Sequence, residues 1–137
     1  MPDCIFCKIA SGAIPSEKVY EDALVFAFMD INPVARGHVL VIPKRHSTDV
    51  TGMTDDEISA VARAFRKLAP AAKAAVHAEG FNILNNAGHV AGQAVDHVHF
   101  HIIPRVADDG RGYRWITLQY RPGEISEVAK AISKNIK

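Results

Sequence analysis

The sequence has few of the features that mark secreted, membrane-spanning or nucleic-acid-binding proteins. Only two of its 137 residues are cysteine, and aromatic residues make up 7%. No apolar run approaches the roughly 20 residues that a membrane span needs. Sixteen lysines and arginines nearly balance fifteen aspartates and glutamates, which excludes a broadly basic surface for nucleic acid. The N-terminus shows no secretory signal. We therefore expect a soluble, cytoplasmic protein with no nucleic-acid or membrane partner.

Nucleotide-binding glycine loops are also missing, since neither a G-x-G-x-x-G nor a P-loop pattern occurs. A doubly wound nucleotide-binding fold is therefore not expected. The length and the hydrophobic content of 48% predict a single domain over residues 1–137. Apolar runs typical of strands cover residues 24–29, 39–42, 81–85 and 95–103, with a weaker candidate at 115–120.

Two segments have helical patterns. A capping box formed by Thr54 and Glu57 predicts the start of a long amphipathic helix. Pro70 is expected to kink or divide this helix, and Gly80 to end it. An apolar stripe over residues 125–136 predicts a C-terminal helix. Because most strands are joined by short loops, we expect an α+β domain with an antiparallel sheet of about five strands and the long helix on one face.

Three histidines alternate with apolar residues at His97, His99 and His101, a set called the triad below. Residues two apart in a strand share a face, about 6.6 Å from one another. The three imidazoles would therefore project from one side of a sheet. Such a row can supply a nucleophile, donors to an anion or metal ligands. Just upstream, Gly92 lets the backbone approach a ligand closely, and the Gln93 side chain could bind an anion or a leaving group.

The two cysteines, Cys4 and Cys7, stand three residues apart. Three interpretations remain open for this spacing: half of a tetrahedral zinc site, a redox pair, or two small buried residues. A reducing cytoplasm disfavours a lasting disulfide.

Residues 92–104, which contain the triad, resemble the signature of the histidine triad superfamily. Residues 4–9, 27–33 and 37–44 also match its Hint-like nucleotide-binding branch, in the same order and with similar spacing. The resemblance covers about residues 4–105. It implies a hydrolase that releases a nucleoside 5′-monophosphate from phosphoramidates or related nucleotide conjugates. The implied reaction passes through a nucleotidyl-histidine intermediate and needs no metal for catalysis.

The resemblance assigns roles to single residues. His99 would be the nucleophile that attacks the α-phosphorus, and His38 would help to orient it. His101 and the Gly92–Gln93 region would hold phosphate oxygens, while Asp30 would accept hydrogen bonds from the ribose. The implied catalytic set is His38, His97, His99 and His101. The implied nucleotide contacts are Phe6, Ile9, Phe28, Asp30, Ile31, Asn86, Gly92, Gln93, Ala94, His99 and His101.

Two positions bear on the type of reaction. His101 stands where the nucleotidyl-transferase branch of the superfamily has glutamine, which favours hydrolysis. Ala94 stands where Hint-like hydrolases usually carry serine or threonine, whose hydroxyl can assist the leaving group. Alanine has no such donor. The alternatives are therefore a dinucleoside polyphosphate hydrolase, or a nucleotide-binding regulatory protein with little turnover.

The resemblance further implies a structural zinc ion and a homodimer. Some members of the superfamily bind zinc through a cysteine pair, a histidine that follows the Ile-Pro-Lys strand, and the first triad histidine. The matching residues here are Cys4, Cys7, His46 and His97. In that case His97 is structural and orients the strand that carries His99. Members of the family are usually homodimers joined through the long helix and a sheet edge.

Overall fold

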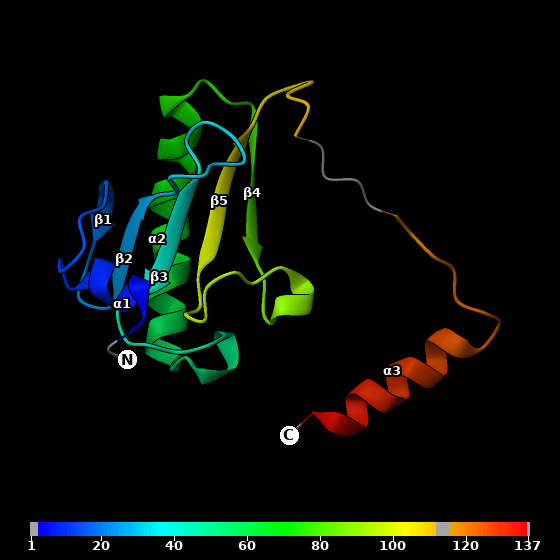
Figure 1. Ribbon diagram of the computed structural model, residues 1–137. Coiled ribbons are helices and arrows are strands. Elements are labelled where there is room, and N and C mark those ends of the chain that lie inside the picture. Colours follow the sequence, from blue (N-terminus) through cyan, green and yellow to red (C-terminus); the bar gives the residue numbers. More distant parts are fainter. Residues whose placement is uncertain (1–2, 112–115, 137) are drawn as a thin grey trace.

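The computed structural model describes residues 3–111 and 116–136. Its centre is a five-stranded antiparallel sheet with the order β1-β2-β3-β5-β4 (Figure 1). The predicted α+β fold is confirmed. The strands are β1 (Lys18–Glu21), β2 (Val25–Met29), β3 (Val39–Pro43), β4 (Gly80–Asn85) and β5 (Phe100–Arg105). The helices are α1 (Ile5–Ala10), α2 (Asp55–Ala75) and α3 (Glu124–Asn135), with short 3-10 turns η1 (Val50–Gly52) and η2 (His89–Ala91).

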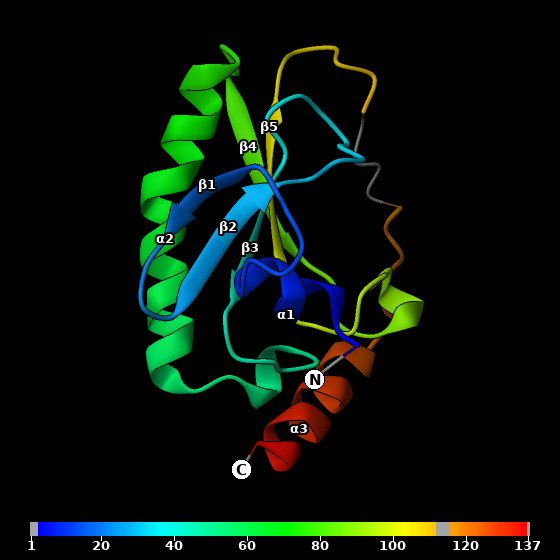
Figure 2. The same cartoon turned by 60° about the vertical axis from the view of Figure 1, so that its left-hand side comes forward.

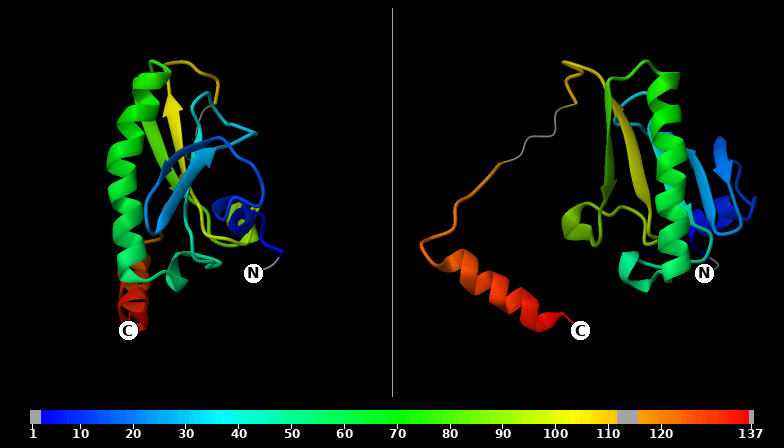
Figure 3. Two further views of the ribbon diagram at one scale, coloured as in Figure 1. Left: turned by 90° about the vertical axis from the view of Figure 1, so that its left-hand side faces the viewer. Right: turned by 180° about the vertical axis from the view of Figure 1, so that it is seen from behind.

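The sheet separates two apolar clusters. On one face, Val25 and Ala27 of β2 pack with the buried side of α2. On the other face, Phe26 and Phe28 pack with α1. Figure 2 and the left panel of Figure 3 show α2 and α1 on opposite sides of the sheet. Because both faces of β2 and β3 are covered, these strands are continuous apolar runs in the sequence.

The triad alternates as predicted, although β5 begins later than expected, at Phe100. Val98 and Ile102 belong to the cluster beneath α2. The triad projects to the opposite face, where the Phe6 ring of α1 meets the rings of its first two histidines. The two-residue period therefore persists through the irregular segment before the strand.

The long helix differs from the prediction at two points. It is not divided at Pro70 but passes through this exposed residue as one continuous helix. It also ends at Ala75, before Gly80, which instead begins β4. At its end the Ala78 N–H donates to the Lys73 carbonyl at 2.8 Å. A non-glycine residue between them, at position 77, adopts the left-handed conformation that commonly ends helices, with φ at 56°.

The strand expected at residues 115–120 is not formed over 116–120, and residue 115 lies outside the described residues. The sheet instead includes β1, a strand that was not predicted. Its sequence is short and polar and lacks the apolar pattern that predicts a strand. Helix α3 forms as predicted, but its apolar residues are exposed and it lies apart from the sheet (Figure 1). Among the described helices, none has the length and apolar character needed to cross a membrane.

Candidate functional site

A cavity of about 410 Å³ opens on the α1 side of the sheet. Helix α1 and strand β2 form its apolar walls, and two triad histidines lie at its base. Of the contacts expected from the sequence, those that line it are Phe6, Ile9, Phe28, Asp30, Ile31, Ala94, His99 and His101. The geometry therefore gathers eight of the expected residues around one space.

Sequence reasoning missed more than half of the cavity wall. The additional residues are Ile5, Ile14, Pro15, Ser16, Glu17, Met29, Asn32, Leu40 and Val95. Several lie in the segment that joins α1 to β1, which has no periodic pattern. Others are neighbours of expected residues, and only the packing of α1 on the sheet brings them to the cavity.

The Gln93 side chain does not line the cavity, because it is buried in hydrogen bonds within the chain. Its Nε2 donates to the carbonyl oxygens of Thr48 at 2.7 Å and Val95 at 3.0 Å. Its Oε1 accepts from the Gly88 N–H at 2.8 Å. Both amide hydrogens of Gln93 already have acceptors within the chain, so binding of phosphate by this side chain stays a prediction that would require these hydrogen bonds to change. Gln93 thus fixes the loop that carries η2.

Gly92 and Asn86 also support this loop and do not line the cavity. Gly92 has φ at 96°, and its N–H donates to the His89 carbonyl at 3.0 Å. A Cβ at position 92 would lie 3.3 Å from the Asn86 Nδ2, which itself donates to the Gly92 carbonyl at 3.5 Å. Glycine is therefore needed here for its left-handed backbone and for the close approach of Asn86.

His99 is held with one ring nitrogen free. It is 6% exposed, and its Nδ1 lies 2.8 Å from the His97 carbonyl oxygen. A carbonyl oxygen only accepts, so Nδ1 carries the proton and the lone pair of the neutral ring is on Nε2. The His99 carbonyl in turn accepts from Asn85 Nδ2 at 2.8 Å. The backbone thus holds His99 with its Nε2 lone pair available at the cavity, where the ring lies among the lining side chains.

His38 forms a relay to His101, whose ring packs edge-on against His99, so the predicted orienting of His99 by His38 would act through His101. The Val34 N–H donates to His38 Nδ1 at 3.0 Å. Since that nitrogen accepts, the proton of His38 is on Nε2, which lies 2.8 Å from His101 Nδ1. His101 must then carry its own proton on Nε2. The relay makes His101 a hydrogen-bond donor.

Both relay histidines have lowered pKa values, which favours their neutral forms. Burial first, and then the nearby rings of His99 and His38, lower the pKa of His101 to about 4, while Asp30 opposes the shift. Burial also lowers the pKa of His38, and Asp30 again acts in the opposite direction. The Asp30 Oδ2 lies 3.6 Å from His38 Nε2.

Asp30, His38 and His101 are close enough together to suggest a metal site, with donor atoms within 4.8 Å. The tautomer of His38 argues against it. A neutral imidazole that binds a metal through Nε2 carries its proton on Nδ1. That proton would point at the Val34 N–H, which already donates to the same atom. We therefore interpret this group as a hydrogen-bond relay.

A second cluster joins the two cysteines to His46 and His97, whose donor atoms also lie within 4.8 Å of one another. The His97 Nδ1 is 3.4 Å from Cys4 Sγ and 3.5 Å from Cys7 Sγ. The His46 Nδ1 is 3.5 Å from Cys7 Sγ. Tetrahedral Zn²⁺, with Zn–S near 2.3 Å and Zn–N near 2.0 Å, separates such donors by about 3.5 Å. The four side chains therefore fit zinc.

The tautomer of His97 agrees with this fit. This residue is fully buried, and its Nε2 lies 2.8 Å from the Pro43 carbonyl oxygen. The Nε2 therefore carries the proton, and the Nδ1 lone pair faces the two sulfur atoms. A backbone carbonyl that accepts from the other ring nitrogen is the usual support of a histidine metal ligand. His97, expected in both the catalytic and the metal sets, thus faces the cysteines and does not line the cavity.

Comparisons with known proteins find similar chains in one family. The model of the HIT domain family matches residues 11–108. The adenosine 5′-monophosphoramidase hnt1 of Schizosaccharomyces pombe is 42% identical over 135 residues, covering 98% of each chain. The crystal structure of a HIT family member from Bacillus subtilis matches with a TM-score of 0.92 and 45% identity, covering 98% of each chain.

The crystal structure of a zinc-bound histidine triad family protein from Mycobacterium smegmatis matches with a TM-score of 0.76 and 35% identity. The match covers 98% of this chain and 99% of that one. Together, the triad at the base of a cavity, the family model over most of the chain and these relatives show that the chain belongs to the histidine triad family.

Proposed function

We propose that this protein hydrolyses the bond between phosphorus and nitrogen in nucleoside 5′-phosphoramidates and releases the nucleoside 5′-monophosphate. The observation that carries the proposal is the tautomer of His99, whose Nε2 lone pair is available at the base of the cavity. The name of the S. pombe relative supports the same class of reaction.

In this mechanism the nucleoside lies between α1 and β2, against Phe6 and Phe28, with Asp30 accepting from the ribose hydroxyls. His99 Nε2 attacks the α-phosphorus as the phosphorus–nitrogen bond breaks, and the amine leaves with a proton from solvent. Water then attacks the phosphorus, breaks its bond to Nε2 and returns a proton to solvent. The Nε2–H of His101 donates to the phosphate oxygens in both steps. Positioning and charge neutralisation supply most of the rate increase.

A second candidate, a nucleotide-binding protein with little turnover, is favoured by one observation. Ala94 lines the cavity and has no hydroxyl to donate to the leaving group. Without such a donor, expulsion of a basic amine depends on solvent. The rate of hydrolysis of a dinucleoside polyphosphate would depend less on a donor at position 94, because its leaving group is less basic.

The test is release of the monophosphate from adenosine 5′-phosphoramidate and from a diadenosine polyphosphate. We expect the wild type to prefer the phosphoramidate and His99→Ala to abolish turnover while still binding adenosine monophosphate. His77→Ala, which alters an exposed histidine outside the cavity, is the matched control. Full turnover by His99→Ala would contradict the mechanism. Tight monophosphate binding without turnover by the wild type would select the binding protein.

We further propose that Cys4, Cys7, His46 and His97 hold one structural Zn²⁺ per chain. The separations of their donor atoms and the tautomer of His97 support this assignment. Elemental analysis of protein produced with sufficient zinc is expected to give one zinc per chain. The Cys7→Ser variant should lose it, whereas His77→Ala should retain it.

We also propose that the protein is a homodimer. Phe81 and Ile83 are both 42% exposed on the edge strand β4, and the apolar residues of α3 are exposed as well. Unpaired edge strands with apolar side chains are ready to pair with another chain. Light scattering should give twice the mass of the chain, and Phe81→Glu should reduce it to one chain. A monomeric wild type would overturn the proposal.

A further inference from the structure

His46 differs from the other three residues of the proposed zinc site in how its position is fixed. Cys4 and Cys7 belong to the start of α1, where the Cys7 N–H donates to Cys4 Sγ at 3.4 Å. His97 is held through its Nε2 by the Pro43 carbonyl. The His46 ring lies edge-on to the His97 ring, with ring centroids 5.1 Å apart, and its Nδ1 is 3.5 Å from Cys7 Sγ. Among the described residues, no hydrogen bond from outside the proposed zinc site holds this ring, so its position depends on its backbone.

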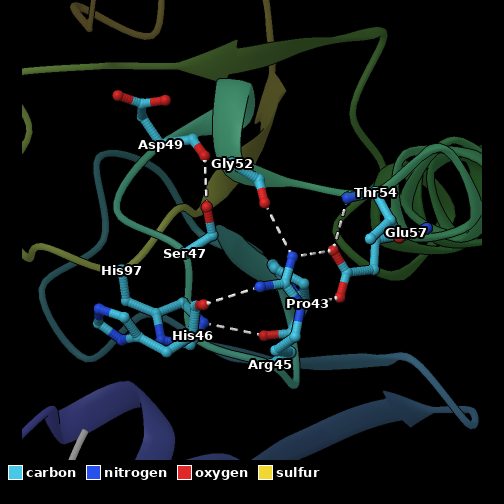
Figure 4. Close-up of polar contacts among 9 residues, drawn as sticks. All are labelled: Pro43, Arg45, His46, Ser47, Asp49, Gly52, Thr54, Glu57 and His97. Carbon is cyan, nitrogen blue, oxygen red and sulfur yellow. Dashed lines mark hydrogen bonds and ion pairs between the residues drawn. The ribbon is translucent and has the colours of Figure 1, made fainter.

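The residue before His46 is fixed firmly to helix α2. Arg45 donates from Nε to Glu57 Oε1 at 2.7 Å and from Nη2 to Glu57 Oε2 at 2.8 Å (Figure 4). Its Nη2 also donates to the Gly52 carbonyl at 2.8 Å, and its Nη1 to the His46 carbonyl at 3.5 Å. A paired fork of this kind fixes direction as well as distance.

Glu57 is itself buried and hydrogen-bonded. It is 4% exposed, and its Oε2 accepts from the Thr54 N–H at 2.8 Å as part of the capping box of α2. The hydrogen bond from Arg45 is the main reason that the pKa of Glu57 falls to about 2. Both members of the pair are therefore charged throughout the working pH range.

The residue after His46 is fixed as well. The Ser47 carbonyl accepts from the Val98 N–H at 2.7 Å, beside the triad, and Ser47 Oγ donates to the Asp49 carbonyl at 2.7 Å. Figure 4 shows His46 between these two anchors, next to His97. One anchor reaches the N-terminus of α2 and the other reaches the segment before β5. The ion pair thus lies one residue from a proposed metal ligand whose ring is held by no hydrogen bond from outside the proposed site among the described residues.

We propose that the Arg45–Glu57 ion pair is a positioning device that holds His46 in place for the metal, an inference that rests on the proposed zinc site. Electrostatics alone makes the opposite prediction for Arg45. A guanidinium near a cation site repels the metal, so its removal would tighten zinc binding. If the pair acts by position, its removal weakens zinc binding.

The experiment measures zinc affinity of the full chain by competition with a chromogenic chelator. We expect Arg45→Met to bind zinc more weakly, on the order of 10-fold, because loss of supporting contacts around a ligand typically costs this much. Glu57→Gln, which keeps the size of the side chain, should weaken binding in the same direction. The double variant should be no weaker than Arg45→Met, because both changes break one device.

Arg105→Met is the matched control, since Arg105 makes an equally close two-fold ion pair with Asp109 at 2.7 and 2.8 Å on a different part of the chain. It should lose comparable thermal stability and keep wild-type zinc affinity. Zinc affinity of Arg45→Met equal to or tighter than wild type would overturn the inference. So would an equal loss of affinity in Arg105→Met. Absence of zinc binding by the wild type would instead overturn the proposed zinc site itself.

Discussion

At the scale of single residues, hydrogen bonds fix the tautomer of each histidine in the site. Two backbone carbonyls, those of His97 and Pro43, fix the protons of His99 and His97. One backbone N–H, that of Val34, fixes the proton of His38 and through it the proton of His101. The backbone therefore sets which nitrogen of each ring carries the proton, and so which ring has a lone pair on Nε2, which ring donates from Nε2 and which ring faces the sulfur atoms.

The first prediction concerns the relay. His38→Ala should lower kcat on the order of 10-fold to 100-fold with a smaller change in KM, because His101 Nδ1 loses its donor and the proton on Nε2 is no longer fixed. Steady-state kinetics on adenosine 5′-phosphoramidate measure this, with His77→Ala as the control. If His38→Ala raised KM alone, the relay would serve binding and not the chemical step.

The second prediction concerns pH and stability. The folded protein holds the pKa of His101 at about 4, below the ordinary value of 6.5. Between these values the unfolded chain binds the proton and the folded chain does not, so stability falls as the pH falls through this window. We expect a loss on the order of 2–3 kcal/mol between pH 6.5 and 4, because one pKa unit is worth about 1.4 kcal/mol.

Calorimetry of wild type and His101→Gln across this range tests the second prediction. The variant should lose less stability on acidification, because glutamine does not take up the proton. Identical slopes for the two proteins would show that His101 is not the group responsible.

At the scale of elements, the loop that carries η2 depends on one buried amide. The Gln93 side chain joins Gly88, Thr48 and Val95, and so connects the loop to the segment before α2. This explains why a residue expected to bind phosphate lies outside the cavity. Its hydrogen-bonding capacity is already used to place the residues that do line the cavity, Ala94 and Val95.

The third prediction follows from these hydrogen bonds. Gln93→Glu should destabilise the fold on the order of 2–3 kcal/mol, because a carboxylate has no proton to donate to the Thr48 and Val95 carbonyls. Urea unfolding measures the change. Glu79→Gln is a control, since it alters an exposed carboxyl elsewhere. A variant as stable as wild type would mean that the loop is held by other contacts.

At the scale of the whole molecule, the proposed zinc site joins three distant segments. Its residues come from α1, from the segment after β3 and from the segment before β5. Cys4 and His97 are 93 residues apart in the sequence. A metal at this point would close α1 over the sheet, and α1 is one wall of the cavity. The metal is thus expected to support the site without contacting the substrate.

The fourth prediction is that removing zinc with a chelator lowers the Tm on the order of 10 °C, because a ligand that binds only the folded state stabilises it. Turnover should fall with it, since the His97 carbonyl orients His99. Added zinc should restore both. Differential scanning fluorimetry and kinetics measure the two effects, and the Cys4→Ser variant should show neither response. A Tm unaffected by chelation would contradict a structural role.

Some features of the fold could be predicted from the sequence because they depend on interactions between residues close together in the chain. The alternation of the triad with valine, phenylalanine and isoleucine sets which side chains face the core. The capping box of Thr54 and Glu57 starts α2, as predicted. Other features could not be predicted because they depend on distant partners. The polar strand β1 was not predicted and forms by pairing with β2, whereas the strand predicted at 115–120 is not formed over residues 116–120.

The triad and its alternating faces could be predicted from the amino-acid sequence, and the resemblance to the histidine triad superfamily implied the four residues proposed to bind zinc. Which nitrogen of each ring carries the proton depends on the three-dimensional fold, because the carbonyl and N–H groups that contact these rings are placed by the folded backbone. Only the tertiary structure showed that Gln93 is committed to its loop and that His38 serves His101. A hydrogen bond needs its partner within about 3 Å, and sequence spacing does not determine which distant groups reach that distance.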